Sequence, residues 1–302
     1  MIPLFWRCKY AELVGGTTQV AGFGSNGEFV QNICEDSGQI AHKFVMLFAT
    51  SDVGIVVPGK ATFGGIWTWP VSNSHLVSMK GCLNGFLDAL QVHYSEMHMP
   101  PEYFFPEVFQ AQHEVLQEIG AKILYTDTSY HIDLKSWATS DMSKGNRKKL
   151  RQCQEIDLQT TRLHRSDIGA AYELIEANRL ALGVTPSVSL AQMTKMFDDM
   201  PDIYESFGTY YGQDLVAAAI TVMITDKIRY VYMWADDAEY RLLSPVVALC
   251  NGIIEYSIAE GNSVLDLGTA SEFGNINEGL ARFKTNLGAI ATNKITYSIS
   301  SF

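Results

Sequence analysis

The chain is poor in positive charge. It carries 22 lysines and arginines against 33 aspartates and glutamates, which gives a formal net charge of −11 over 302 residues. Proteins that bind nucleic acid over a broad surface are usually basic, because they neutralise phosphates. The balance therefore argues against a general nucleic-acid binder and confines any RNA contact to a local patch.

Cysteine is scarce as well. The five cysteines are scattered, odd in number and never in a C-x-x-C pair. This pattern argues against a disulfide framework and against a structural zinc site, and it favours buried thiols in a reducing compartment. None of the seven histidines stands in an H-x-x-x-H or H-x-E spacing, so we predict no metal site.

Targeting and membrane signals are also lacking. The first ten residues, MIPLFWRCKY, have no basic patch followed by a long apolar core, and no apolar run approaches the roughly 20 residues that span a bilayer. We expect a soluble, cytoplasmic protein without membrane insertion. No G-x-x-x-x-G-K-[ST] or G-x-S-x-G motif occurs, so P-loop and serine-hydrolase functions lose their usual evidence.

Length and composition indicate two globular domains. The chain is 47% hydrophobic and 18% charged, and 302 residues suit two domains of about 150 residues. The densest positive charge lies at 143–151, SKGNRKKLR, where we place the boundary. We thus predict domains at 1–142 and 143–302, each of α/β class.

Hydrophobic periodicity predicts helices and strands in both halves. In the first half we expect two strands within 41–57, a glycine-rich loop at 59–66, helices at 76–95 and 105–119, and a strand at 122–134. In the second half we expect helices at 167–182, 189–199, 245–260 and 276–286, and strands at 215–224, 228–235, 263–268 and 289–299.

Two features of the second half suggest a site. Ser244 and Pro245 open a helix, whose free N–H groups and dipole attract anions, although an ordinary capped helix is the simpler interpretation. Asp266, which looks exposed at the end of an LDLG strand, has the position of a general base or of a group that holds a substrate amine. A strand-end Asp that bonds turn amides is the alternative.

Cations and aromatic residues add two further candidates. Arg282 and Lys284 flank Phe283 on a short helix, where they suit an anionic substrate or merely form a solvated face. Tyr230, Tyr232 and Trp234 alternate along one strand, so they line either a pocket or the core. The basic segment 143–151, with Asn146 and Arg147, binds phosphates or forms a solvated linker helix.

The order of these segments resembles the Fem-type and CelD-like branch of the GNAT acyltransferase superfamily. Four motifs and one loop carry the resemblance. They are R-x-x-[IL]-[RK] at Arg147–Arg151, Y-x-x-x-[SG]-P-x-x-x-L at Tyr240–Leu249, [FL]-D-[FL]-G at Leu265–Gly268, F-K-x-x-[FL]-G at Phe283–Gly288, and ATFGGI at 61–66.

The resemblance implies two tandem GNAT-like domains with mixed sheets, the first degenerate and the second holding the acyl-donor site. It implies transfer of an acyl group from acyl-CoA, such as acetyl-CoA, to an amine or hydroxyl of a small molecule, sugar or cell-wall precursor. Asp266 would then be the catalytic base and Tyr232 the catalytic acid. The donor would contact Trp234, Arg241, Leu243, Ser244 and Val246, and the acceptor Asn146, Arg147, Arg282 and Lys284.

One departure leaves alternatives open. Related enzymes hold the CoA pyrophosphate with a [RQ]-x-x-G-x-[GA] loop, whereas residues 241–246 here read Arg-Leu-Leu-Ser-Pro-Val. The glycines are missing, and Pro245 removes an N–H donor. An aminoacyl-tRNA-dependent Fem-type ligase, supported by the basic segment, and a catalytically silent GNAT-like binding module are therefore the two other hypotheses.

Overall fold

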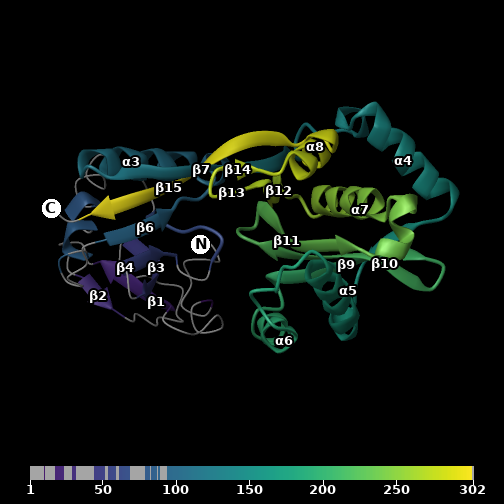
Figure 1. The fold of residues 1–302 in the computed structure, drawn as a ribbon, viewed down its shortest axis with the longest axis horizontal. Coiled ribbons are helices and arrows are strands. Elements are labelled where there is room, and N and C mark those ends of the chain that lie inside the picture. Colours follow the sequence, from purple (N-terminus) through teal and green to yellow (C-terminus); the bar gives the residue numbers. More distant parts are fainter. Residues whose placement is uncertain are drawn as a thin grey trace. The chain divides into compact units, whose positions relative to one another are not determined.

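The chain has a mixed α/β fold (Figure 1). The computed structural model describes Tyr10 and residues 18–23, 29–31, 44–51, 54–58, 61–68, 79–81, 83–86, 88 and 94–300. Two compact units emerge, one of residues 1–128, 271–275 and 292–302 and one of residues 129–270 and 276–291. The expected boundary at 142/143 lies inside the second unit, because the chain passes between the units within strand β7 (Lys122–Asp133).

The first unit contains a mixed sheet of short strands. Antiparallel pairs join β1 (Thr18–Phe23) to β2 (Phe29–Gln31) and to β3 (Phe44–Ser51), which also pairs with β4 (Gly54–Val57) and β5 (Ile66–Thr68). The adjacent β3 and β4 confirm the strand pair predicted within 41–57. Strand β4 runs parallel to β6 (Tyr94–His98), and β6 is antiparallel to β15 (Ile290–Ser300).

Helix α3 (Pro106–Glu118) covers this sheet. Proline occupies its first turn, where the missing N–H needs no partner, and Gly120 follows its end with φ +77°. Its buried residues share a core cluster with Phe48, Met97 and Tyr297 of the strands. The predicted helix at 105–119 is confirmed. The predicted helix at 76–95 is wrong at its end, because Tyr94 already begins β6.

The second unit contains six strands in the order β7-β12-β11-β10-β9-β8. They are β7, β12 (Val264–Thr269), β11 (Ile228–Asp236), β10 (Asp214–Met223), β9 (Tyr204–Tyr211) and β8 (Gln159–Arg162). The β10–β11 hairpin turns at residues 224–227, as expected, and Lys227 N–H donates to Thr225 Oγ1 over 3.2 Å. Strand β9 was not expected, because its sequence YESFGTYY lacks a clear alternation of apolar and polar residues.

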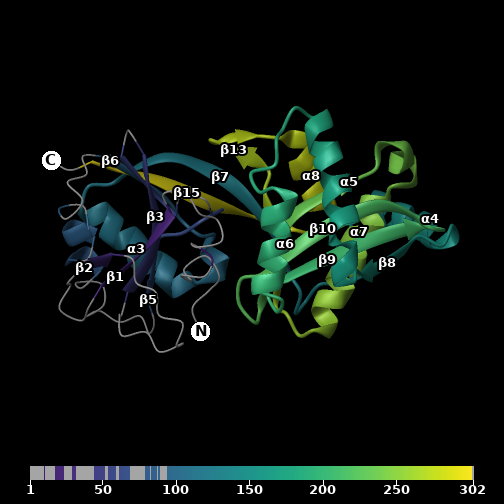
Figure 2. The same ribbon diagram turned by 90° about the horizontal axis from the view of Figure 1, so that it is seen from below.

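Helices lie on both faces of these strands. Figures 1 and 2 show α7 (Pro245–Ala259) on one face and α5 (Ile168–Ala181) with α6 (Leu190–Asp199) on the other. Helix α4 (Lys144–Glu155) packs against α7, and α8 (Glu278–Asn286) follows β12. Side-chain caps start three of them: Ser143 accepts from Asn146 N–H, Ser189 forms a capping box with Gln192, and Asn277 accepts from Leu280 N–H.

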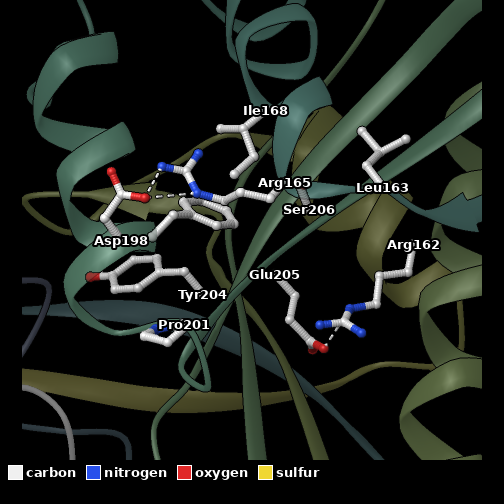
Figure 3. Close-up of a pocket in the computed structure, with 10 residues that line it drawn as sticks. Arg162, Leu163, Arg165, Ile168, Asp198, Pro201, Tyr204, Glu205 and Ser206 are labelled. Atoms are coloured by element: carbon white, nitrogen blue, oxygen red, sulfur yellow. Dashed lines mark hydrogen bonds and ion pairs between the residues drawn. The ribbon is translucent and has the colours of Figure 1, made fainter.

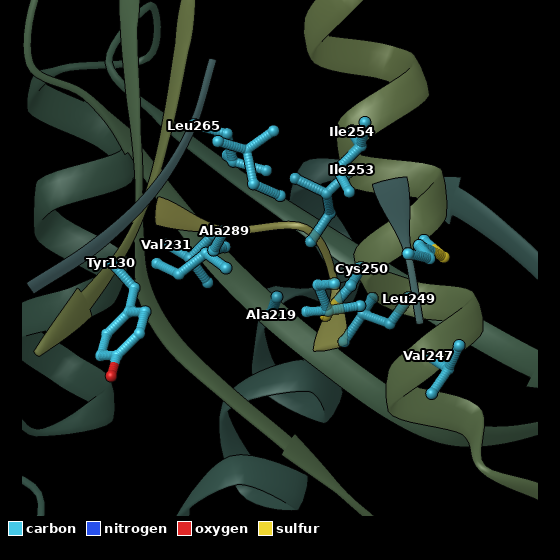
Figure 4. Packing of buried hydrophobic residues seen from close by; sticks show 14 of the residues in the cluster. Tyr130, Ala219, Val231, Val247, Leu249, Cys250, Ile253, Ile254, Leu265 and Ala289 are labelled. Carbon is cyan, nitrogen blue, oxygen red and sulfur yellow. The ribbon is translucent and has the colours of Figure 1, made fainter. Parts of the chain in front are cut away.

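The main core of this unit lies between α7 and the sheet (Figure 4). Leu249 and Ile253 of α7 are fully buried and meet strand residues such as Ala219 and Leu265. Helix α7 is apolar nearly all round, with nine buried residues, because α4 covers its other side. This packing holds the first turns of α7 near the start of β10 and the end of β11, where the candidate site lies.

Candidate active site

Strands β11 and β12 run parallel but are paired over only three residues each. Ile228–Tyr230 face Val264–Asp266, and no further register pair joins the two strands. Strand β11 nevertheless continues to Asp236 and β12 to Thr269. Along this stretch the backbone N–H groups on one edge of β11 have no neighbouring strand to bond. Such an edge can hold a carbonyl oxygen of a ligand.

A β-bulge in β11 occurs where this pairing ends. Val231 and Met233 pair with successive residues of β10, so Tyr232 is the extra residue. The bulge changes the alternation of side chains. Trp234 packs with Val231 against the α7 core, whereas the ring of Tyr232 lies 6.2 Å from that of Tyr230, outside this core. The prediction that Tyr230, Tyr232 and Trp234 share one face is therefore wrong.

Asp266 lies at a second bulge, in β12. Asp266 and Gly268 pair with successive residues of β7, which leaves Leu267 extra. The Asp266 side chain is buried, 1% exposed, and its Oδ1 accepts from Gly268 N–H over 2.7 Å. Gly268 has φ +75°, a left-handed conformation that favours glycine. The predicted bonding of turn amides is confirmed, and the prediction of an exposed Asp266 is wrong.

Lys284 on α8 is buried, with 2% exposure. Its Nζ donates to Gly268 O over 3.0 Å and to Thr269 O over 2.8 Å, and it lies 6.0 Å from the centre of the Trp234 ring. Burial lowers the pKa of Lys284 to about 8, while the nearby Asp266 carboxylate opposes that shift. Lys284 thus fastens α8 to the end of β12.

The other residues of this helix have different roles from those expected. Phe283 is half-buried, and its ring meets that of Trp234 edge-on at 5.7 Å, so it anchors the segment as predicted. Arg282 is exposed. The prediction that Arg282 and Lys284 flank Phe283 as two accessible cations is wrong, because only Arg282 reaches solvent.

Tyr232 lies on the α5 side of the sheet, among polar groups. Burial raises the pKa of Tyr232, and the Ser187 hydroxyl that bonds it and the Arg179 guanidinium nearby both oppose this shift. Arg179 Nε is buried and has no hydrogen-bond partner among the described residues. Tyr232 therefore has a hydroxyl neighbour and a cation neighbour that the sequence pattern did not reveal.

The segment after β11 is held by internal contacts and is not an open anion-binding loop. Arg241, in the 3₁₀ helix η5 (Ala238–Leu243), forms an ion pair with Asp236, Nη2 to Oδ1 3.0 Å, and that carboxylate raises the pKa of Arg241. Leu243 O accepts from Cys153 Sγ of α4 over 3.3 Å. Val246 is half-buried beside the α7 core. Arg241 is therefore already paired, although it remains exposed.

Ser244 does not cap α7 in the expected way. Its side chain makes no cap hydrogen bond, and its φ of +59° lies in the left-handed region. This is the position at which the related loop pattern has glycine. The backbone has therefore kept a conformation suited to glycine although the side chain has changed.

We expect Ser244→Gly to raise the free energy of unfolding by about 1 kcal/mol, because a non-glycine residue in the left-handed region costs about 1–2 kcal/mol and the more flexible unfolded glycine offsets part of this. Urea unfolding followed by circular dichroism would measure the change. Ser143→Gly is the matched control. Ser143 has φ −56° and caps Asn146 N–H, so its replacement should lower stability. A Ser244→Gly protein that is less stable than the parent would contradict the proposal that the Ser244 backbone is strained.

Helix α4 carries the two predicted acceptor residues, Asn146 and Arg147, as well as four exposed cations. Asn146 is buried, 4% exposed, and its Nδ2 has no partner among the described residues. Arg147 Nη1 donates to Ser140 O and Met142 O over 2.7 and 2.6 Å. Neither side chain is a free substrate contact as the structure stands. The exposed cations of this helix are Lys144, Lys148, Lys149 and Arg151.

The structure brings some predicted site residues together. Trp234, Lys284 and the end of β12 meet on the α7 side, while Tyr232 lies at the bulge on the other side. Arg241–Val246 follow β11, and Asn146 and Arg147 belong to α4. Sequence reasoning missed both bulges, although the glycine of LDLG was a signal for the second.

The described residues hold neither a metal-ligand cluster nor a membrane-spanning helix. In that part of the chain no three His, Cys, Asp or Glu side chains gather as ligands for a metal ion. Nor does any helix described there combine the length and the apolar character needed to cross a bilayer.

Comparisons with known proteins agree with this geometry. Residues 140–285 match the acetyltransferase (GNAT) domain family. The solved structure of FemX has 12% identity and a TM-score of 0.66, covering 98% of this chain and 90% of that one. L-PGS from Bacillus licheniformis has 12% identity and a TM-score of 0.61, covering 96% and 86%. A tandem GNAT protein from the clavulanic acid biosynthesis pathway has 10% identity and a TM-score of 0.50, covering 94% and 83%. No curated protein matches the chain in sequence.

Proposed function

Since residues 140–285 match the acetyltransferase (GNAT) domain family, we propose that the chain transfers an acyl group from acyl-CoA to an amine of a small-molecule, sugar or cell-wall precursor acceptor. The observation that carries this proposal is the separation of β11 from β12 beyond the pair Tyr230 and Asp266. It leaves an unpaired backbone edge beside a bulge. An acyl carbonyl needs such preorganised N–H donors when its oxygen becomes negative.

The proposed reaction is direct attack. The amine nitrogen of the acceptor attacks the acyl carbonyl, whose oxygen accepts from N–H groups of β11 near Tyr232–Trp234. The carbon–sulfur bond of the donor then breaks. Tyr232 donates its phenolic proton to the leaving sulfur, and the proton lost by the amine returns through water to Tyr232. No covalent intermediate on the protein is required.

Asp266 has a positioning role in this proposal. It is buried and bonded to Gly268, so it orders the bulge rather than facing the acceptor. Its negative charge also holds Lys284 near the end of β12. A base that meets the acceptor directly would need an exposed oxygen, and water takes that role here.

The donor is proposed to lie at residues 241–246 and the face of α4. Val246 N–H has no acceptor among the described residues, and it lies in the first turn of α7, where the helix dipole favours anions. Cys153 of α4 bonds Leu243 O, so α4 lies directly against this loop. The exposed lysines of α4 add positive charge beside a loop that lacks the glycines of the related pattern. They suit the phosphates of CoA.

The same basic face favours a second candidate, an aminoacyl-tRNA-dependent ligase. Lys144, Lys148 and Arg151 recur at helical spacing and are all exposed. A stripe of cations of this kind suits a polyanion as well as a short phosphate group. Affinity for tRNA would fall steeply with salt, because phosphate contacts release counterions.

Calorimetric titration of acetyl-CoA and CoA into the purified protein tests the proposal. A donor at one hundred times its dissociation constant should raise the free energy of unfolding by about 2.7 kcal/mol, which a thermal shift also detects. We expect Lys148→Glu with Lys149→Glu to weaken binding at least tenfold. Lys195→Glu is the matched control, because Lys195 is paired with Asp199 on α6.

Turnover is then followed as free thiol released from acetyl-CoA with a panel of amines. Tyr232→Phe should lower turnover by about 10²-fold, the usual contribution of one proton donor, without weakening acetyl-CoA binding. Failure of every acyl-CoA to bind, together with salt-sensitive binding of charged tRNA, would replace the proposal by the second candidate. If neither binds, a silent binding module remains.

A further inference from the structure

A cavity of about 310 Å³ lies at the edge of the second unit's sheet, away from the donor loop (Figure 3). Strand β8 ends at Arg162, which pairs with Phe207 of β9, so the first residues of β9 pair with β10 on one edge and have no strand on the other. The 3₁₀ helix η4 (Arg165–Asp167) and the end of α6 enclose this gap. Because β9 is uncovered here, side chains from both of its faces reach the cavity.

Two ion pairs border the cavity. Arg162 Nε lies 2.9 Å from Glu205 Oε1, and Arg165 Nη2 lies 2.5 Å from Asp198 Oδ1. Figure 3 shows these pairs on two sides of the pocket. Between them the lining is apolar, with Leu163 and Ile168 among its residues. The cavity thus combines an apolar floor with a charged rim.

The polar groups left unused in this cavity are mostly donors. In the described structure Arg162 uses only Nε, and Arg165 uses Nε and Nη2, so three terminal guanidinium nitrogens are uncommitted. Glu205, in contrast, already accepts from Arg162, from buried Arg229 and from Tyr256. Asp198 keeps one carboxylate oxygen, Oδ2, without a partner among the described residues, but that side chain is 61% exposed. The spare donors therefore outnumber the spare carboxylate oxygens, which favours an anionic ligand.

Ser206 gives an independent indication of a ligand. Ser206 is one of the residues that line the cavity and is 2% exposed, and its Oγ is buried without a hydrogen-bond partner among the described residues. A buried hydroxyl without a partner lowers stability, so an alanine would fold better at this position. A bound molecule that accepts its hydrogen bond would remove that cost.

We propose that this cavity binds a small organic carboxylate with an apolar tail. The carboxylate would accept from Arg162, Arg165 and Ser206, and the tail would pack against Leu163 and Ile168. A volume near 300 Å³ is at the small end of ligand pockets. Arg229 reaches Glu205 from the start of β11, whereas the donor loop follows Asp236 at its end, about 20 Å further along the strand. The cavity is therefore separate from the proposed donor site.

Thermal shift and calorimetry with three probes test this proposal: sodium 4-methylpentanoate, sodium acetate and inorganic phosphate, at constant ionic strength. We expect 4-methylpentanoate to raise the melting temperature and to bind at least tenfold more tightly than the other two. If acetate or phosphate had the same effect as 4-methylpentanoate, the proposal that the ligand has an apolar tail would be overturned. No saturable effect of any probe up to 20 mM, on the order of a weak fragment's dissociation constant, would overturn the site.

Variants locate the binding. Ser206→Ala should fold at least as stably as the parent and yet lose most of the 4-methylpentanoate shift, a combination that a merely structural serine would not give. Arg162→Gln should weaken binding about tenfold. Arg151→Gln, at an exposed arginine of α4, is the matched control and should bind as the parent does. Undiminished binding by both Ser206→Ala and Arg162→Gln would place the ligand elsewhere and overturn the proposal.

Discussion

Lys284→Met is expected to lower the free energy of unfolding by about 3–5 kcal/mol at pH 7. Loss of the lysine would leave the buried Asp266 carboxylate without its opposite charge. Lys284 is 2% exposed and donates to Gly268 O and Thr269 O. Methionine fills a similar volume but leaves both carbonyls without this donor and removes the positive charge that interacts with Asp266. Urea unfolding of both proteins would measure the loss.

The same substitution should change how stability depends on pH. The pKa of Lys284 is lowered to about 8 in the folded protein, against 10.5 for an ordinary lysine. Between these values the unfolded chain binds more protons than the folded one, so the lysine's contribution to stability rises with pH. The parent should therefore gain about 3 kcal/mol relative to Lys284→Met from pH 7 to pH 10.5. A constant difference across this window would show that the lysine's pKa is not shifted.

A double variant separates the charge effect from loss of packing. Asp266→Asn removes the carboxylate that is left without its cation, so it should restore part of the stability lost in Lys284→Met. Asp266→Asn alone should weaken the Gly268 contact, since an amide oxygen is a poorer acceptor than a carboxylate. Strict additivity of the two losses would mean that the residues do not interact.

Arg229→Met is expected to cost about 3–5 kcal/mol, again from a broken buried ion pair. The arginine is 2% exposed and pairs with Glu205, while Thr221 Oγ1 and Asn262 Oδ1 accept two more of its hydrogen bonds. Its guanidinium carbon also lies 5.1 Å from the centre of the Tyr256 ring. Urea unfolding would measure the loss, which should appear without any change in acetyl-CoA affinity at the distant donor loop.

Arg162→Gln is a control that the chain itself provides. Arg162 binds the same Glu205 carboxylate, but its side chain is 53% exposed, so solvent screens the pair. Its removal should cost less than about 1 kcal/mol. If the two substitutions had equal effects, burial would not be the reason for the importance of Arg229.

Local signals determined much of the fold of residues 143–300. Ser189, a residue type favoured at N-caps, begins the helix expected at 189–199, and the structure has Ser189 as its N-cap, in a capping box with Gln192. Gly261 after α7 and the turn at 225–227 were equally readable, because caps and turns depend on a few neighbouring residues. Strand β9 was not predicted, because both of its faces are covered and its sequence therefore lacks an alternation of apolar and polar residues.

The sequence predicted the candidate site only in part. The motifs located the correct segments, LDLG and FKTNLG, and the family match includes the first and the start of the second. They did not show which side chains are free. Arg241 is held by Asp236, Arg147 by two carbonyls, and Lys284 by two more. Each of those partners is set by packing.

The sequence by itself predicted most helices and strands of the second half, and the resemblance to the GNAT superfamily, since these rest on spacing along the chain. Tertiary structure alone decided that Tyr232 stands at a bulge, that Asp266 is buried and that Lys284 rather than Phe283 is the most enclosed residue of α8. Register between strands and burial of charge depend on residues far apart in sequence, whose free energies of pairing have no local signature.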